Sequence, residues 1–583
     1  MNENNSRDIG NVITETLHLT EENGSTAAAG MIQKISSFFV QLRRKFASAC
    51  EASVLAGLLE KLYIRILTCK VRVAAVFLLS FGIVSLVFRY AVNLSVSHFI
   101  ADNNTVSSLF LIIISLVLFT TNRTVHSLIM NSRLLGNLSI AYSEQSIIFK
   151  NSGYIVNDTT YSTSFFLGII CGICSVVYPI SAICTFILSI LFVILIFNRP
   201  ECGMLFMTAL LPFLGKGTIF LCVLITFCAL LYRYMLGKRH IKLGAAKIIM
   251  VISLIYLIVR GLLSGTSFIN TRFLIYVCFY LSAITAMSLI RSTAMFRRTV
   301  TVLITMTRAF SAVFALYYLG SIFFGKDSVS EFLNVMNIDS LTNSLTSTFF
   351  IVPFLCMSIP LNFAYLIGDS NGKNAVWNLL CLIVLLASLV YVSSYAVILI
   401  CILSCVAVLF LFDKKYGLLA VPAPFIAYAI VKLFDLIPQA YKLTSVNEYV
   451  TDFGLFFDTF KKHILFGAGP DITDFSGNMM INVLVTFGLC GFILLSSILI
   501  YMTVKTIKSV SAYQMKSNKA RFLTIGLLCA QLSFIALCMF TDIYCDLNAI
   551  FMFSAVITSS FVSGPCYLSD YVDASTVREH LSK

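Results

Sequence analysis

Apolar runs of about 17 to 25 residues recur along most of this chain, and short polar segments separate them. A helix rises about 1.5 Å per residue, so each run can cross the roughly 30 Å hydrocarbon core of a bilayer. The runs do not show the short alternating segments that the strands of a membrane β-barrel require. The pattern therefore predicts an all-α, polytopic bundle of transmembrane helices.

We expect 16 crossings, with 14 as the alternative because several runs are short. They lie near residues 72–92, 105–121, 164–179, 181–198, 201–215, 217–236, 244–263, 272–290, 299–323, 345–367, 374–392, 395–412, 416–434, 479–504, 522–541 and 546–563.

The segments outside these runs divide the chain. Residues 1–35 are polar and predict a disordered tail. Residues 36–71 predict a basic amphipathic helix, either lying on the inner membrane surface or packed on the cytoplasmic loops. The remaining divisions are an N-terminal hairpin and loop at 72–163, a membrane core at 164–565 with a long loop at 435–478 that contains a short surface helix, and a tail at 566–583.

Basic residues gather in alternate loops. Arg123, Arg133 and Lys150 share one loop, and Lys505 and Lys508 begin another, on the same side as the basic N-terminal segment. The positive-inside rule makes this side the cytoplasm, with both termini inside and residues 435–478 outside. Orientation thus accounts for the formal net charge of +14, and no basic segment interleaved with aromatics points to nucleic acid.

Composition and motifs exclude several other classes. The chain is 58% hydrophobic and 12% charged, a balance that no soluble domain can cover with polar surface. Most of the 18 cysteines lie in apolar runs, and the Cys171–Cys174 CxxC has no second pair and no nearby His, so we expect no metal site. No P-loop and no dinucleotide fingerprint in a βαβ unit is present, so we expect no cofactor.

The stretch from Ile464 to Gly491 combines a polar segment with the start of an apolar run. Gly467 and Asn478 bound the polar segment, and the apolar run continues to about Val504. Gly488 and Gly491 lie three residues apart within it, where a neighbouring backbone can approach closely. An irregular polar loop at the mouth of a membrane helix is a place where a lipid with a polar head meets protein.

Two arginines flank a short loop on the predicted outer side. Arg260 lies near the outer end of one crossing, and Arg272 begins the next. Guanidinium groups match phosphate oxygens bidentately, so the pair can clamp a diphosphate. Alternatively, each arginine anchors its helix at the interface by snorkelling.

The spacing of these residues resembles a known signature. Gly467 and Gly469 form a GxG turn, and nine residues separate Asn478 from Gly488, which Gly491 follows. This signature, with weaker likenesses at 198–203 and 540–557, resembles the O-antigen ligase and O-antigen polymerase family of membrane glycan transferases over roughly residues 165–565. The resemblance implies binding of a polyprenyl-diphosphate-linked glycan at the outer face of the cell membrane and transfer to an acceptor, in polysaccharide biosynthesis with other assembly proteins.

The sequence departs from the family at two positions that matter for chemistry. The family's His falls at Gly477, and its upstream arginine falls near Tyr449. His463 is then the best candidate base and Asn478 the retained polar residue of the motif, while Lys461 and Lys462 join the two arginines as candidate diphosphate partners. A catalytically silent relative that binds glycan lipid is the alternative, and a transporter or flippase is a third hypothesis.

The predicted orientation can be tested by cysteine labelling in an otherwise cysteine-free protein. A membrane-impermeant maleimide added from outside should label Ile472→Cys, because the 435–478 loop faces outward, and should not label Met515→Cys. The reverse pattern would invert the assignment.

Overall fold

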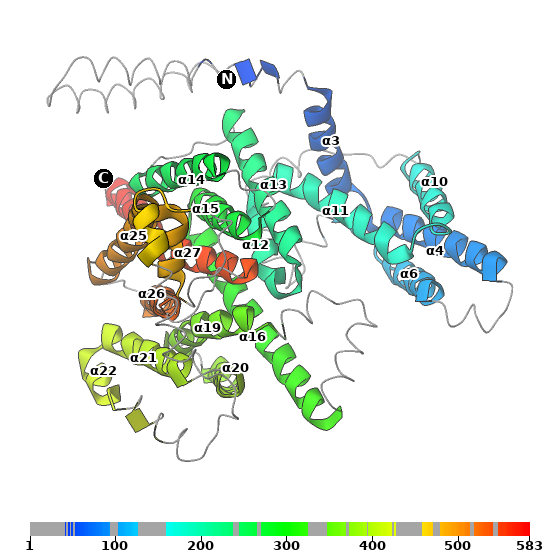
Figure 1. Ribbon diagram of the computed structural model, residues 1–583. Helices are drawn as coiled ribbons and strands as arrows, with labels where there is room; N and C mark the ends of the chain where they lie inside the picture. The colour runs from blue at the N-terminus through cyan, green and yellow to red at the C-terminus, as the bar shows by residue number, and fades with distance from the viewer. Residues whose placement is uncertain are drawn as a thin grey trace.

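The structure, a computed structural model, describes residues 53–93, 103–125, 159–236, 244–264, 270–324, 347–368, 372–392, 395–422, 457–469, 478–512, 518–539 and 546–582, with a few single positions between them. Within these ranges the chain is helical apart from turns and one isolated β-bridge, between Lys70 and Thr124. Eight of the described helices are long and apolar enough to cross a membrane, and seven shorter apolar helices accompany them. This confirms the predicted all-α helix bundle of a multi-pass membrane protein (Figure 1).

The helices follow the order of the predicted crossings. They are α3 Val54–Thr68, α4 Val71–Asn93, α6 Asn103–Phe119, α10 Thr159–Cys174, α11 Ile180–Asn198, α12 Pro200–Leu210, α13 Lys216–Met235, α14 Ala245–Leu263, α15 Thr271–Leu289, α16 Thr293–Phe324, α19 Thr348–Gly368, α20 Gly372–Val392, α21 Tyr395–Phe412, α22 Lys414–Ala420, α25 Met479–Ala512, α26 Asn518–Leu537 and α27 Leu547–Ser582.

Some predicted segments fall wholly or largely outside the described residues. These are the tail 1–35, the first part of the 36–71 helix, and most of the 435–478 loop, of which residues 457–462 form the expected short helix. Of the expected crossing 416–434, α22 covers only the beginning. The tail 566–583 is helical to Ser582 because α27 continues through it.

Helices α4, α6 and α10 pack as a three-helix unit on one side of the molecule (Figure 1). Gly168 and Gly172, one turn apart on α10, allow α10 to approach α4 closely. A Cβ on Gly168 would lie 2.6 Å from the carbonyl oxygen of Phe77, and one on Gly172 would lie 2.7 Å from Cβ of Val84. This spacing of small residues is a common means of helix association in membranes. The CxxC pattern of α10 therefore lies on a packing helix, and its cysteines are free.

Helix α27 occupies the centre of the larger bundle. Of its span Leu547–Gly564, 94% is buried inside the protein. The ring of Phe553 stacks on Phe534 of α26 with centroids 4.0 Å apart, and Ser554 shares a 2.7 Å hydrogen bond with Ser282 of α15. A helix enclosed in this way is held by protein contacts on all sides, whereas the outer helices present apolar side chains where lipid would lie.

Three arginines donate to carbonyls at the C-terminal ends of neighbouring helices. Arg72 bonds Phe119 of α6 at 3.2 Å, Arg233 bonds Phe197 of α11 at 3.1 Å, and Arg521 bonds Phe412 of α21 at 3.3 Å. Each cation lies at the negative end of a helix dipole and satisfies a carbonyl that has no partner within its own helix. In the predicted order of crossings these three helix ends share one side of the membrane, which we call the basic face.

Arg308 lies midway along α16 and joins three helices. Its Nε and Nη1 atoms donate to the amide oxygens of Asn362 on α19 and Asn378 on α20, each at 2.8 Å. Its guanidinium also lies 4.8 Å from the ring centroid of Tyr365. Side chains within the bundle thus accept hydrogen bonds from its Nε and Nη1 atoms, which lowers the cost of the charge in the membrane.

We predict that Gly168→Ala lowers the free energy of unfolding by about 1–3 kcal/mol, because the new methyl group collides with a backbone carbonyl that cannot move freely. The same substitution at Gly217, where a Cβ would meet nothing within 4 Å, should have a much smaller effect. Thermal unfolding in detergent checks the pair, and equal midpoints would show that the α4–α10 contact tolerates the extra atom.

Candidate functional site

Helix α25 is interrupted inside its membrane span. Gly488 adopts φ 67° and ψ −171°, so residues 479–512 form two helices that meet at a kink. The break lies about nine residues from the start of α25, which is roughly 14 Å into the span. Backbone groups freed at this depth have no water to bond, so the protein must supply their partners.

The turn at residues 464–469 supplies most of these partners. The carbonyl oxygens before the break accept hydrogen bonds from the turn, and the amides after the break donate to it. The bonds are Ala468 N to Val485 O at 2.8 Å, Gly469 N to Thr486 O at 3.0 Å, Leu489 N to Ile464 O at 2.8 Å and Cys490 N to Leu465 O at 3.1 Å. We call residues 464–469 and 485–490 together the glycine clasp.

Glycine is required at three positions of the clasp. Gly467 and Gly469 have φ values of 71° and 106°, and Gly488 also lies in this left-handed region. A Cβ on Gly467 would collide with the amide nitrogen of Gly488, and a Cβ on Gly488 would collide with that of Gly467. The two backbones touch only because both residues lack a side chain. The backbone of the turn thus lies close to Gly488, whereas Gly491, the other glycine expected to allow a close approach, faces the side chains of Phe487 and Tyr256.

Helix α14 braces the clasp from one side. The hydroxyl of Tyr256 donates to the carbonyl of Phe487 at 2.7 Å, which satisfies a third oxygen freed by the break. One turn later, Nη2 of Arg260 donates to the carbonyl of Gly467 at 2.5 Å. The Nε atom of Arg260 is buried and has no hydrogen-bond partner among the described residues. The guanidinium thus holds the turn and keeps donor capacity for another acceptor.

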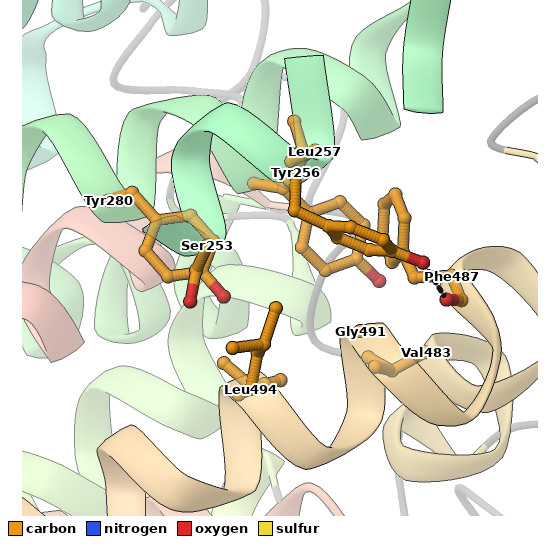
Figure 2. A pocket seen from close by; sticks show the side chains of 10 residues that line it. Ser253, Tyr256, Leu257, Tyr280, Val483, Phe487, Gly491 and Leu494 are labelled. Carbon is orange, nitrogen blue, oxygen red and sulfur yellow. Dashed lines mark hydrogen bonds between the residues drawn. The ribbon is translucent and has the colours of Figure 1, made fainter. Parts of the chain in front are cut away.

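A small hollow, partly open to the surroundings and with room for about one water molecule, adjoins the clasp between α14, α15 and α25. Figure 2 shows Tyr256 reaching the carbonyl of Phe487 at one end and Tyr280 beside Ser253 at the other. Tyr276 packs edge-on against Phe487, with ring centroids 4.6 Å apart. The walls are mostly apolar, with a few hydroxyl groups nearby.

The structure brings some of the predicted site residues together. Arg260, Gly467, Gly469 and Gly488 meet in the clasp. Gly491 lies one turn beyond the break, where a Cβ would be 3.3 Å from the ring of Tyr256.

The start of α15, at Thr271, lies close to the end of α14 that carries Arg260, because a Cβ on Gly261 would lie 2.7 Å from the ring of Phe273. The side chain of Arg272 itself lies outside the described residues.

Other predicted residues lie around the clasp or away from it. Lys461, Lys462 and His463 are exposed just before the turn. Asn478 begins α25, where its Oδ1 accepts from the amide of Met480 at 2.9 Å and its Nδ2 donates to the carbonyl of Met539 at 2.9 Å. It therefore caps α25 and ties it to the end of α26. Gly477 and Tyr449 lie outside the described residues.

A carboxylate in a short turn between apolar runs is ordinarily solvated, but Asp546 is not. Asp546 is 3% exposed and caps α27, accepting from the amides of Asn548 at 2.8 Å and Ala549 at 3.1 Å. Its other oxygen lies 3.8 Å from Nζ of Lys216 on α13. Burial raises the pKa of Asp546 above its ordinary value, and Lys216 opposes part of this shift. The sequence signal for this role was an Asp directly before a helical pattern, which is typical of a helix N-cap.

Among the described residues, no group of three or more His, Cys, Asp or Glu side chains is placed to hold a metal ion. The described polar groups at the clasp are backbone amides and carbonyls, one guanidinium and nearby hydroxyls. No protein-family model and no curated protein sequence matches this chain.

We predict that Gly488→Ala destabilises the protein more than Gly217→Ala does. The alanine at position 488 must adopt a left-handed conformation and collides with the turn, whereas position 217 is open. A loss of about 2–4 kcal/mol follows from combining backbone strain with overpacking. Unfolding in detergent measures the difference, and a matching effect at both positions would show that the clasp contributes nothing to stability.

We also predict a pH-dependent effect at Asp546. The raised folded-state pKa means that ionisation costs stability as pH rises from the ordinary value of 3.8 through that pKa. Asp546→Asn keeps a good helix cap but removes this cost, so its stability relative to the parent should increase across that window. Lys216→Gln removes the cation that opposes the shift, so the pKa of Asp546 should rise further and the loss of stability should continue to higher pH. Unfolding midpoints over a pH series provide the measurement, and parallel profiles for parent and Asp546→Asn would contradict the assignment.

Proposed function

We propose that this chain binds a polyprenyl-diphosphate-linked saccharide at the glycine clasp, on the outer face of the cell membrane with both termini in the cytoplasm. The observation that carries the proposal is Arg260. Its guanidinium lies at an irregular backbone turn within a membrane bundle, and its Nε donor has no hydrogen-bond partner among the residues that the structure describes. Phosphate oxygens are suitable acceptors for such a group.

The surroundings of Arg260 fit both parts of such a lipid. Lys461 and Lys462 are exposed beside the turn, and Arg272 lies at the start of the helix that adjoins Gly261. These cations favour a diphosphate near the clasp. Exposed aliphatic side chains of α14, such as Val259 and Leu262, suit contact with part of the hydrocarbon chain. Neither feature requires a nucleotide or a metal.

Transfer of the saccharide is the fuller form of this proposal, and silent binding is its alternative. Transfer requires proton removal from an acceptor hydroxyl, and His463 is the available base four residues before Gly467. Yet His463 is exposed, and Asn478 is engaged as a helix cap. These two positions favour binding more directly than catalysis.

The break in α25 is the one observation that favours a transporter, since discontinuous helices form the substrate sites of many carriers. In such sites the unwound backbone coordinates ions or substrate. Here the freed carbonyls of Val485, Thr486 and Phe487 already accept bonds from the turn and from Tyr256. The occupied backbone therefore supports lipid binding at a closed clasp over transport.

The test is binding of a short-chain polyprenyl-diphosphate saccharide to the protein in nanodiscs. Arg260→Gln should weaken binding by about tenfold or more, because a charge-assisted hydrogen bond is lost. Arg89→Gln is the matched control, since Arg89 also donates to a backbone carbonyl, that of Ser175, but far from the clasp. Equal affinities for the two variants would refute the proposed site.

A transfer assay with the same substrate separates the two forms of the proposal. A lower rate for His463→Ala than for the parent would support His463 as the base, and equal rates would eliminate it. Intact binding with no transfer by the parent would favour the silent relative.

A further inference from the structure

Basic residues from three segments converge where α3, α4 and α6 meet. Cys69 and Val71 pair with the segment after α6, with Val71 N donating to Arg123 O and Val125 N to Cys69 O, both at 3.0 Å. The isolated bridge between Lys70 and Thr124 is the centre of this pairing. It brings Arg123 beside Lys70, although more than fifty positions separate them in the sequence.

The charges of this cluster face outward. Helix α3 buries Tyr63 and Leu67 against a small core that includes Ile194 of α11, and this contact turns Lys61 and Arg65, one turn apart, away from the protein. Lys61, Arg65, Lys70 and Arg123 are exposed, and Arg72 is half-buried against the last carbonyl of α6. The segments 61–72 and 119–125 contain no Asp or Glu, and none of the five cations has a carboxylate partner among the described residues.

The cluster lies at the edge of the apolar part of the bundle. The membrane span of α4 begins at Val71, directly after Lys70, and α6 ends at Phe119, four residues before Arg123. The preceding turns of α6 expose Ile113, Leu116 and Val117. A ligand held here would meet cations at one end and exposed aliphatic side chains at the other. This combination matches a phospholipid better than a soluble anion.

We propose that Arg65, Lys70, Arg72 and Arg123 form a binding site for the phosphate headgroup of an anionic diacyl phospholipid at the basic face, with Lys61 one turn beyond Arg65 on α3 extending the positive surface. The two-part surface makes phosphatidylglycerol a suitable probe, with its phosphate among the cations and its acyl chains along α6. This site is separate from the glycine clasp and does not depend on the proposed function there.

The experiment compares phosphatidylglycerol with phosphatidylcholine binding to the purified full-length protein by native mass spectrometry. The test variant is Arg65→Gln/Lys70→Gln/Arg123→Gln, which leaves Arg72 and its bond to α6 in place. The control is Lys414→Gln/Lys415→Gln/Lys505→Gln, which removes the same charge from exposed residues elsewhere. The test variant should lose about tenfold or more in affinity for phosphatidylglycerol, and the control should resemble the parent.

Two further measurements keep the proposal open to refutation. Arg65→Lys/Lys70→Arg/Arg123→Lys preserves the charge and should retain phosphatidylglycerol, which shows that lost binding in the test variant reflects charge and not misfolding. Glycerophosphoglycerol, which has the headgroup without acyl chains, should compete poorly. Equal losses in test and control variants would overturn the site, and equal competition by glycerophosphoglycerol would overturn the lipid assignment.

Discussion

A break in a membrane helix is tolerable only when the freed backbone groups find partners inside the protein, and α25 meets this requirement at Gly488. The turn at 464–469 accepts from the amides after the break and donates to carbonyls before it, and Tyr256 bonds the carbonyl of Phe487. Each unsatisfied group would cost several kcal/mol in hydrocarbon. This constraint fixes the position of the turn against α25 and α14.

The close contact of the two backbones in the clasp also determines how Arg260 is held. The turn can approach only because Gly467 and Gly488 have no side chains, and its tight curvature directs a carbonyl toward Arg260. Arg260 is therefore first a residue that stabilises the turn. Its remaining donor is held in place by the same bond, so any phosphate that it binds would meet a preorganised group and not a mobile surface side chain.

Arginines elsewhere in the bundle also form hydrogen bonds with acceptors inside the protein. Arg72, Arg233 and Arg521 bond carbonyls at helix C-termini, where backbone acceptors and the helix dipole both favour a cation. Arg308 uses two asparagine side chains inside the membrane span. The basic cluster near Lys70 differs because its charges point outward, away from any carboxylate among the described residues, which makes it available to a headgroup.

The apolar runs in the sequence were enough to identify an all-α membrane protein, because runs long enough to span a bilayer leave few alternatives. The sequence also located Gly467, Gly469 and Gly488, since glycine spacing is a local property of the chain. The break of the helix at Gly488 became evident from the packing of the turn against α25, because the apolar run continues without interruption through this position. The tertiary structure also shows that Asp546 is buried beside Lys216, that Arg308 meets Asn362, and that Arg123 joins Lys70. Each of these outcomes depends on which distant segment supplies the partner, and hydrophobic periodicity contains no information about that choice.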